Sequence, residues 1–268
     1  MCIPDSQGSL ASSPGALKRS RTRIFILSLL SLGTMINYLD RTILGIVAPK
    51  LTTEIHIDPA MMGIVFSAFA WTYALAQIPG GMFLDRFGNK LTYALSIFFW
   101  SLFTLLQSFS LGLKSLLLLR LGLGVSEAPC FPANSRIVSK WFPQHERARA
   151  TATYTVGEYI GLAAFSPLLF LILEHHGWRT LFFLTGGLGI LFTFVWWRFY
   201  HEPHESKTAN KAELDYIGAD QVANKSENIP FNWRDARRLL CCRQIIGASL
   251  GQFAGNTTLV FFLTWFPT

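Results

Sequence analysis

Charged side chains interrupt three long apolar segments of the sequence. Asp40 and Arg41 are adjacent in the first, Arg120 and Glu127 stand seven residues apart in another, and Glu158 lies in a third. Inside a bilayer, an ionised side chain costs about 3 kcal/mol on insertion scales, so it needs a counter-ion or a water-filled cavity. These residue types at these positions predict a site that binds an ion or carries a proton.

Helical spacing relates these groups to one another. Residues seven apart share a helix face about two turns apart, so Arg120 and Glu127 point the same way. Asp40 and Arg120 fall at a similar expected depth, which predicts an ion pair between them. Glu127 falls nearer the midplane, where a desolvated carboxyl group suits a proton carrier. The alternative is a purely structural buried pair.

Glycine and proline shape the segment that carries Arg120 and Glu127. Gly122 and Gly124 allow a neighbouring helix to approach closely. Pro129 and Pro132 should bend the helix and free backbone carbonyl groups.

Polar groups on two further segments complete the candidate site. Tyr73 and Gln77 lie one helical turn apart, so they could bind a hydroxylated substrate together or pack against neighbours. Glu158 stands between Gly157 and Gly161 and is not expected to face lipid.

The segments that position these groups are long and apolar. Of the 268 residues, 51% are hydrophobic and 15% charged, whereas a soluble domain carries about 25% charged residues. A helix of about 20 apolar residues crosses a bilayer, and open backbone groups are not tolerated there. We therefore predict an all-α membrane protein with spans at 24–48, 60–84, 91–111, 114–138, 150–173 and 179–200, and a seventh beginning near 244.

The basic residues predict the orientation. With the N-terminus in the cytoplasm, 18 Lys and Arg residues fall on the cytoplasmic side, and only Lys50, Lys114 and Arg179 fall outside. This asymmetry follows the positive-inside rule. We expect a multi-pass protein of the cell (inner) membrane with a cytoplasmic N-terminus.

Composition divides the chain into four parts. Residues 1–23 form a disordered cytoplasmic tail, and 24–200 form a six-helix transmembrane bundle. Residues 201–243 are polar and form a cytoplasmic linker, and 244–268 begin a second bundle.

A short charged turn joins the second and third spans. It reads Gly81-Met-Phe-Leu-Asp85-Arg86-Phe-Gly88-Asn-Lys90. Gly81 permits close approach of a helix, Gly88 permits a sharp turn, and Asp85 can face the positive end of a neighbouring helix. The pattern resembles the major facilitator signature G-x-x-x-D-R-x-G-x-[KR]; in that family the neighbouring helix belongs to the second half of the protein.

Further stretches resemble one branch of that superfamily, the anion:cation symporters, which include hexonate, glucarate and galactarate permeases. The matching stretches are 37–41, 66–73, 77–81, 127–129, 131–134, 140–143, 146–147 and 263–268. The resemblance implies the N-terminal six-helix bundle of a twelve-helix transporter, with part of a seventh helix. A proton-coupled symporter of an organic anion such as a sugar acid is the implied function.

The resemblance also implies roles for individual residues. Asp40 and Glu127 match acids implicated in proton coupling, and Arg41 and Arg120 match arginines implicated in charge balance and anion handling. Sugar-acid carriers often have a neutral Gln where this chain has Glu158, and an acid there would repel an anion unless protonated or paired. The residues expected to line or bind substrate are Tyr38, Arg41, Tyr73, Gln77, Arg120 and Glu158.

Two other functions compete with transport. A non-transporting membrane fragment is the alternative, because the site of such transporters forms between two halves; a homodimer of this chain could otherwise supply the second half. A membrane enzyme is not supported, because the six His residues all lie in connections. The expected partners are the lipid bilayer, a small organic anion and a proton. We expect no nucleic-acid partner, because the basic residues that give the net charge of +7 flank the spans. We also expect no metal or other cofactor.

Overall fold

The computed structural model of the chain describes residues 19–218, 237–238 and 241–264. Residues 1–18 of the predicted tail at 1–23, residues 219–236 of the predicted linker and residues 265–268 of the matching stretch at 263–268 therefore lie outside the described residues, whereas Thr22 and Arg23 already belong to the first helix. Within the described ranges, every regular element is helical. The elements are α1 (Thr22–Glu54), α2 (Pro59–Gln107), α3 (Leu113–Glu127), α4 (Cys130–Trp141), α5 (Gln144–Phe199), η1 (Pro203–Glu205), α6 (Lys211–Gly218) and α8 (Arg243–Thr264).

Two of the long helical elements are broken by a glycine. Gly88 in α2 has φ 77° and ψ 174°, and Gly177 in α5 has φ 80° and ψ 170°. Only glycine adopts this backbone region at low cost. α2 and α5 each therefore comprise two segments. Together with α1 and the α3–α4 pair, these segments account for the six predicted spans.

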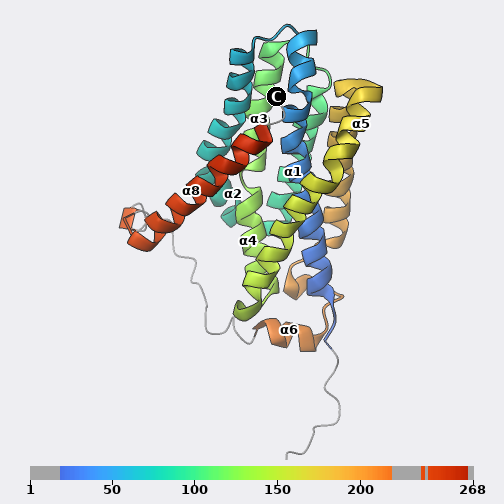
Figure 1. Cartoon of the computed structure of the whole chain (residues 1–268). Helices are drawn as coiled ribbons and strands as arrows, with labels where there is room; N and C mark the ends of the chain where they lie inside the picture. The colour runs from blue at the N-terminus through green and yellow to red at the C-terminus, as the bar shows by residue number, and fades with distance from the viewer. Residues whose placement is uncertain (1–18, 219–236, 239–240, 265–268) are drawn as a thin grey trace, which may run out of the picture.

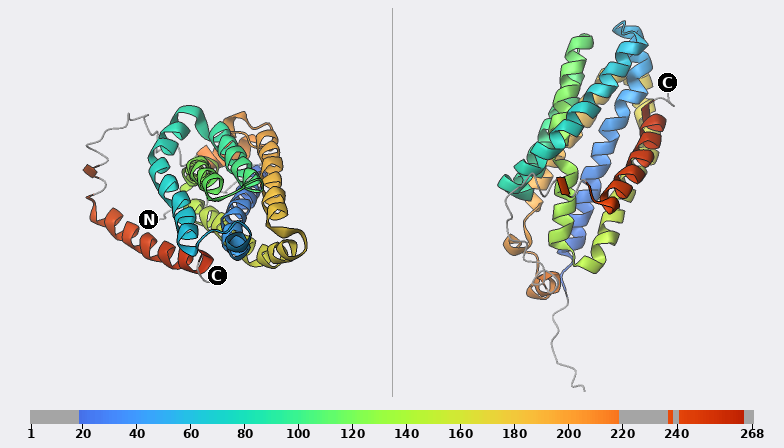
Figure 2. Two further views of the ribbon diagram at one scale, coloured as in Figure 1. Left: turned by 90° about the horizontal axis from the view of Figure 1, so that it is seen from above. Right: turned by 90° about the vertical axis from the view of Figure 1, so that its left-hand side faces the viewer.

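The long helices have the dimensions of membrane spans. Four helical stretches of the described chain are long and apolar enough to cross a membrane: α1, α2, α3 with α4, and α5. Figure 1 shows them standing side by side as one bundle, with α6 beneath it. In the view from above, α8 lies along the outside of this bundle (Figure 2).

α8 coincides with the predicted start of a second bundle. It contacts α1, and every side chain of α8 that the structure describes is exposed. The six-segment bundle therefore leaves these side chains of α8 uncovered.

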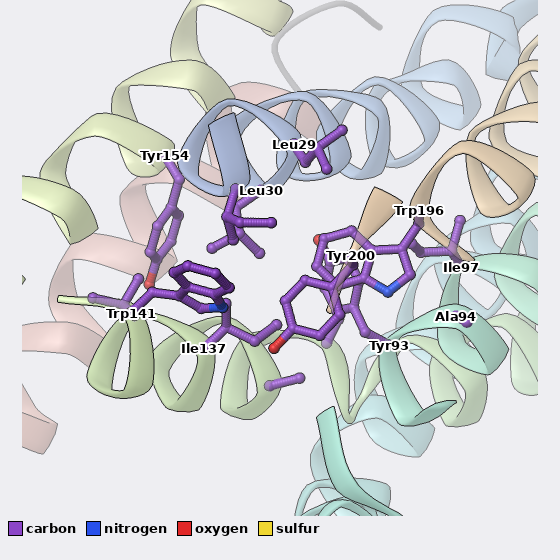
Figure 3. Close-up of a cluster of buried hydrophobic side chains, with 14 of the residues drawn as sticks. Leu29, Leu30, Tyr93, Ala94, Ile97, Ile137, Trp141, Tyr154, Trp196 and Tyr200 are labelled. Carbon is purple, nitrogen blue, oxygen red and sulfur yellow. The ribbon is translucent and has the colours of Figure 1, made fainter. Parts of the chain in front are cut away.

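Two hydrophobic clusters hold the bundle together. The first cluster lies around the beginning of α1 and includes ring contacts between α2 and the end of α5 (Figure 3). There, the Tyr93 and Trp196 ring centroids are 4.3 Å apart, and Trp196 stacks on Tyr200 at 4.4 Å. The second cluster lies around the end of α1 and includes Ile43, Leu51, Leu116, Trp178 and Phe182.

Part of the predicted linker is folded against the bundle. Within 201–243, η1 and α6 are helical, and Glu213 of α6 is fully buried. Its carboxylate accepts hydrogen bonds from the Ser20 hydroxyl and the Arg23 backbone N–H. Tyr216 donates to Glu146 at 2.8 Å. α6 therefore joins the segment before α1 to the first turn of α5, an arrangement that a polar composition alone does not predict.

Candidate functional site

A layer of charged side chains separates the two hydrophobic clusters. α1 contributes Ile36 to the first cluster and Leu39 to the second, and Asp40 and Arg41 follow at this junction. On α3, Arg120 lies between Leu116 of the second cluster and Leu123 of the first. We call this the charged layer and define it as Asp40, Arg41, Arg120, Glu127 and Glu158.

Arg41 and Glu127 form the ion pair at the centre of the charged layer. Arg41 Nε donates to Glu127 Oε1 at 2.6 Å, and Nη2 also contacts that oxygen. The Glu127 side chain is 2% exposed and that of Arg41 is 22% exposed. The pair is thus shielded on the acid's side and partly open on the guanidinium's side.

Four aromatic rings surround the Arg41 guanidinium. Its central carbon lies 5.0 Å from the ring centroid of Tyr38, 5.4 Å from Phe69, 5.1 Å from Tyr73 and 5.7 Å from Phe131. These distances fall within the range of cation–π attraction. The rings come from α1, α2 and α4, so three helices hold the guanidinium in place.

Sequence reasoning placed Tyr38 and Tyr73 in the site but missed Phe69 and Phe131. Phe69 lies one helical turn before Tyr73, and their rings stack at 5.6 Å. Phe131 meets Tyr38 edge to face at 6.3 Å. The i, i+4 spacing of Phe69 and Tyr73 was the available signal, whereas nothing in the spacing of Phe131 indicated its position.

Two glycines bring α3 against its neighbours, as predicted. A Cβ atom on Gly124 would lie 2.2 Å from Thr72 Oγ1 and 2.6 Å from the Phe69 carbonyl oxygen. A Cβ atom on Gly122 would lie 2.6 Å from the Phe103 ring. This close contact between α3 and α2 carries Glu127 to within reach of Arg41.

The helix breaks directly after Glu127. α3 ends at Glu127 and α4 begins at Cys130, so Pro129 interrupts the helix as predicted. That Gly81 permits close helix approach stays a prediction. A Cβ on Gly81 would have no neighbour within 4 Å in the described chain, whereas one on Gly80 would lie 3.0 Å from Pro129.

The predicted ion pair between Asp40 and Arg120 is not formed. Both residues are 4% exposed, but no ion pair within 4.0 Å joins them in the described residues. Both Asp40 carboxylate oxygens and Arg120 Nε and Nη2 lack hydrogen-bond partners there. Glu127 and Asp40 are still close enough to act electrostatically on Arg120. Successive residues on a helix point about 100° apart, and the rotation of α1 turns Arg41 rather than Asp40 toward the acid on α3.

Glu158 reaches the charged layer from α5. A Cβ on Gly161 would lie 2.5 Å from Met35, and one on Gly157 would lie 3.3 Å from the Ser31 carbonyl oxygen. This close packing of α5 on α1 sets Glu158, which is 5% exposed, beside the Tyr38 hydroxyl. As expected, Glu158 lies inside the bundle.

Gln77 lies half-buried on α2, one turn after Tyr73. Its contact with a substrate stays a prediction, as do the roles of the other candidate residues.

The signature turn lies at the end of the bundle that holds the first cluster. Gly88 supplies the sharp turn with its positive φ, as predicted. Asp85 pairs with Arg136 of α4 at 2.8 Å, so its partner in the described residues is a side chain of the same bundle. Arg86 lies over the Phe87 ring, and the Lys90 ammonium lies 5.4 Å from the Trp197 ring centroid.

Glu202 makes two side-chain hydrogen bonds beside this turn. It accepts a hydrogen bond from Asn89 and one from Lys140, each at 3.0 Å. The end of α5 is thereby linked to both α2 and α4.

Comparison with known proteins places this geometry in context. Residues 30–268 match the model of the Major Facilitator Superfamily. The chain is 46% identical over 259 residues to the D-galactonate transporter of Escherichia coli O6:H1, covering 94% of this chain and 60% of the relative. It is 42% identical over 265 residues to a probable galactarate/D-glucarate transporter, GudP, of Escherichia coli K12, covering 93% of this chain and 59% of the relative. The chain thus spans about 60% of the length of these curated relatives.

Solved structures share the fold. A bacterial homologue of the human lysosomal transporter Spinster, in an inward-facing conformation, aligns with a TM-score of 0.61 and 26% identity, over 71% of this chain and 46% of that one. The xylose transporter XylE of E. coli aligns with a TM-score of 0.61 over 76% of this chain and 53% of that one. At 13% identity, this structural similarity supports the fold alone. The family match, the apolar helices and these neighbours show that the chain is a multi-pass, all-α membrane protein of the Major Facilitator Superfamily.

Proposed function

We propose that this protein carries a sugar-acid anion across the membrane together with protons. The relatives named as D-galactonate and galactarate/D-glucarate transporters support the substrate class. The charged layer supplies the groups that such transport needs: two guanidinium groups for a carboxylate, and the acids Asp40 and Glu127 for protons.

The Arg41–Glu127 pair within its four aromatic rings is the observation that carries the proposal. A guanidinium binds a carboxylate through charge-assisted hydrogen bonds, so the carboxylate of a sugar acid competes with Glu127 for Arg41. Protonation of Glu127 removes its charge and releases Arg41 for the substrate. Anion binding and proton binding are coupled because both act on the same guanidinium.

Asp40 and Arg120 provide a second pair of opposite charges in the layer. Both Asp40 carboxylate oxygens and the Nε and Nη2 atoms of Arg120 lack hydrogen-bond partners within the described residues, which supports a response of these groups to a proton or an anion. We propose that Tyr73, whose ring lies 5.1 Å from the Arg41 guanidinium carbon, and Gln77, one turn further along α2, bind the hydroxyl groups of a substrate held by Arg41.

We also propose the membrane orientation that the basic residues predict. The end of the bundle with the signature turn, α6 and the start of α1 then faces the cytoplasm of a cell (inner) membrane. The lipid bilayer, the anion and the proton are the proposed partners.

The test is uptake into proteoliposomes by the protein expressed from its native gene. Labelled D-galactonate, galactarate and D-glucarate are supplied outside the vesicles, where the pH is lower than inside. The native protein should accumulate at least one of these anions. Glu127→Gln should lose gradient-driven uptake while retaining part of the exchange of internal for external anion.

The matched control is Glu174→Gln, because Glu174 is exposed and lies outside the charged layer. It should transport like the native protein. No uptake of any sugar acid by the native protein, or full gradient-driven uptake by Glu127→Gln, would refute the proposal.

A further inference from the structure

The charged layer contains three carboxyl groups but two guanidinium groups. Three carboxylates are buried in it, those of Asp40, Glu127 and Glu158, which are 4%, 1% and 5% exposed. The described residues of the layer include two guanidinium groups. Arg41 binds Glu127 directly, and Arg120 lies in the field of Glu127 and Asp40. Glu158 is therefore the carboxyl group of the layer that has no guanidinium group of its own.

The surroundings of Glu158 offer hydrogen bonding but no spare positive charge. The titratable groups that face it are Tyr38 and Arg41 from α1, Cys130 from α4 and Tyr154 from α5 itself. Arg41 is the cation among them, and Glu127 already occupies it.

Glu158 is also fixed in place by backbone packing. The close contacts of Gly157 with Ser31 and of Gly161 with Met35 leave α5 little room to rotate away from α1. The carboxyl group therefore stays beside the hydroxyl group of Tyr38. The ring of the same tyrosine packs against the Arg41 guanidinium. An anion bound at Arg41 would sit within the electrostatic field of Glu158.

A buried carboxylate without a counter-ion takes up a proton rather than remain charged. A second negative charge nearby strengthens this demand, because like charges disfavour ionisation of both groups. Glu158 already lacks a cation of its own among the described residues, and an anion bound at Arg41 adds to its demand for a proton.

We propose that Glu158 is a third proton-carrying group of the site, so that each anion travels with one more proton than Asp40 and Glu127 can carry. This inference rests on the proposed function. On anion binding, the Glu158 carboxylate takes a proton from water on the entry side. The neutral carboxyl group is held by Tyr38, and the proton returns to water on the side where the anion leaves.

Equilibrium accumulation in proteoliposomes counts the coupled protons. With the membrane potential held at zero by potassium and valinomycin, each coupled proton raises the accumulation ratio of the anion about tenfold per unit of pH gradient. The slope of the logarithm of that ratio against the pH gradient equals the number of protons. The Glu158→Gln protein should accumulate about tenfold less anion per pH unit than the native protein.

Tyr38→Phe is the matched control, because it removes the hydroxyl group beside Glu158 but keeps the acid. It should retain the native slope even if its apparent affinity falls. If Glu158→Gln does not transport, the protons taken up when the anion binds are counted with a pH indicator in unbuffered, mildly alkaline detergent solution. The native protein should take up one more proton per bound anion than Glu158→Gln.

The outcomes separate the two proposals. Equal slopes, or equal proton uptake, for the native protein and Glu158→Gln would overturn the role of Glu158 and leave sugar-acid transport standing. Absence of both uptake and binding of every sugar acid by the native protein would overturn the proposed function, and this inference with it.

Discussion

Replacing Arg41 by alanine should destabilise the protein more than replacing Arg120. Arg41→Ala leaves Glu127 buried without its counter-ion, and breaking a buried ion pair in this way costs about 3–5 kcal/mol. The Arg41 side chain is 22% exposed, so water partly compensates and the lower end, about 3 kcal/mol, applies. Loss of contact with the four rings adds about 1–2 kcal/mol in total.

The measurement is the free energy of unfolding of the purified protein in mixed micelles, followed by denaturant titration. Four proteins form a double-mutant cycle: the native protein, Arg41→Met, Glu127→Gln and the double variant. Because the double variant removes both charges together, it should recover about 1–3 kcal/mol relative to the sum of the single costs. Arg120→Ala should cost less than Arg41→Ala, since Arg120 has no ion pair within 4.0 Å in the described residues.

Additive costs in this cycle, to within about 0.5 kcal/mol, would refute the reasoning. So would a larger loss for Arg120→Ala than for Arg41→Ala. Either result would mean that the carboxylate of Glu127 does not depend on Arg41.

Five further substitutions test the packing of the bundle. Gly124→Ala should lower both the thermal midpoint and uptake, because the new methyl group overlaps the α2 backbone, whereas Gly81→Ala, which meets open space, should leave both within error. Gly88→Ala should cost about 1–3 kcal/mol of unfolding free energy by denaturant titration, because its φ of 77° and ψ of 174° suit glycine alone. Glu202→Gln should loosen the end of α5, seen as faster backbone hydrogen exchange there. Glu213→Ala should release α6, seen as faster proteolysis between α5 and α6 with an unchanged helical circular-dichroism signal.

The helices and their breaks followed from the sequence because they depend on local chemistry. Long apolar runs can only be helices in lipid, and Gly88 and Pro129 act on their own backbone. The close contacts at Gly122 and Gly124 were likewise visible, because a missing side chain permits approach whichever neighbour makes it.

The pairing of charges could not be read from the sequence. Asp40 and Arg41 are neighbours in the chain, and a rotation of α1 by less than a third of a turn decides which of them meets α3. Depth along a helix follows from residue number, but rotation about its axis depends on packing of all its neighbours. The same limit applies to the close contact of Gly80 with Pro129, because the rotation of α2 decides which residue faces α4.

The docking of α6 was hidden for a different reason. A polar composition indicates that a segment avoids lipid, but it does not distinguish a free linker from a helix held by side-chain hydrogen bonds. The buried carboxylate of Glu213 is an ordinary surface acid as far as its sequence neighbours show.

The breaks at Gly88 and Gly177 match each other in local sequence and in backbone geometry. Each follows an acid by three residues and precedes a base by two, as Asp85 and Lys90 do around Gly88, and Glu174 and Arg179 around Gly177. Their backbone angles agree within 4°, yet one adjoins the first hydrophobic cluster and the other the second. Such a correspondence is typical of the inverted three-helix repeats found within each half of Major Facilitator transporters. The signature turn therefore has a counterpart of the same backbone geometry next to the other hydrophobic cluster.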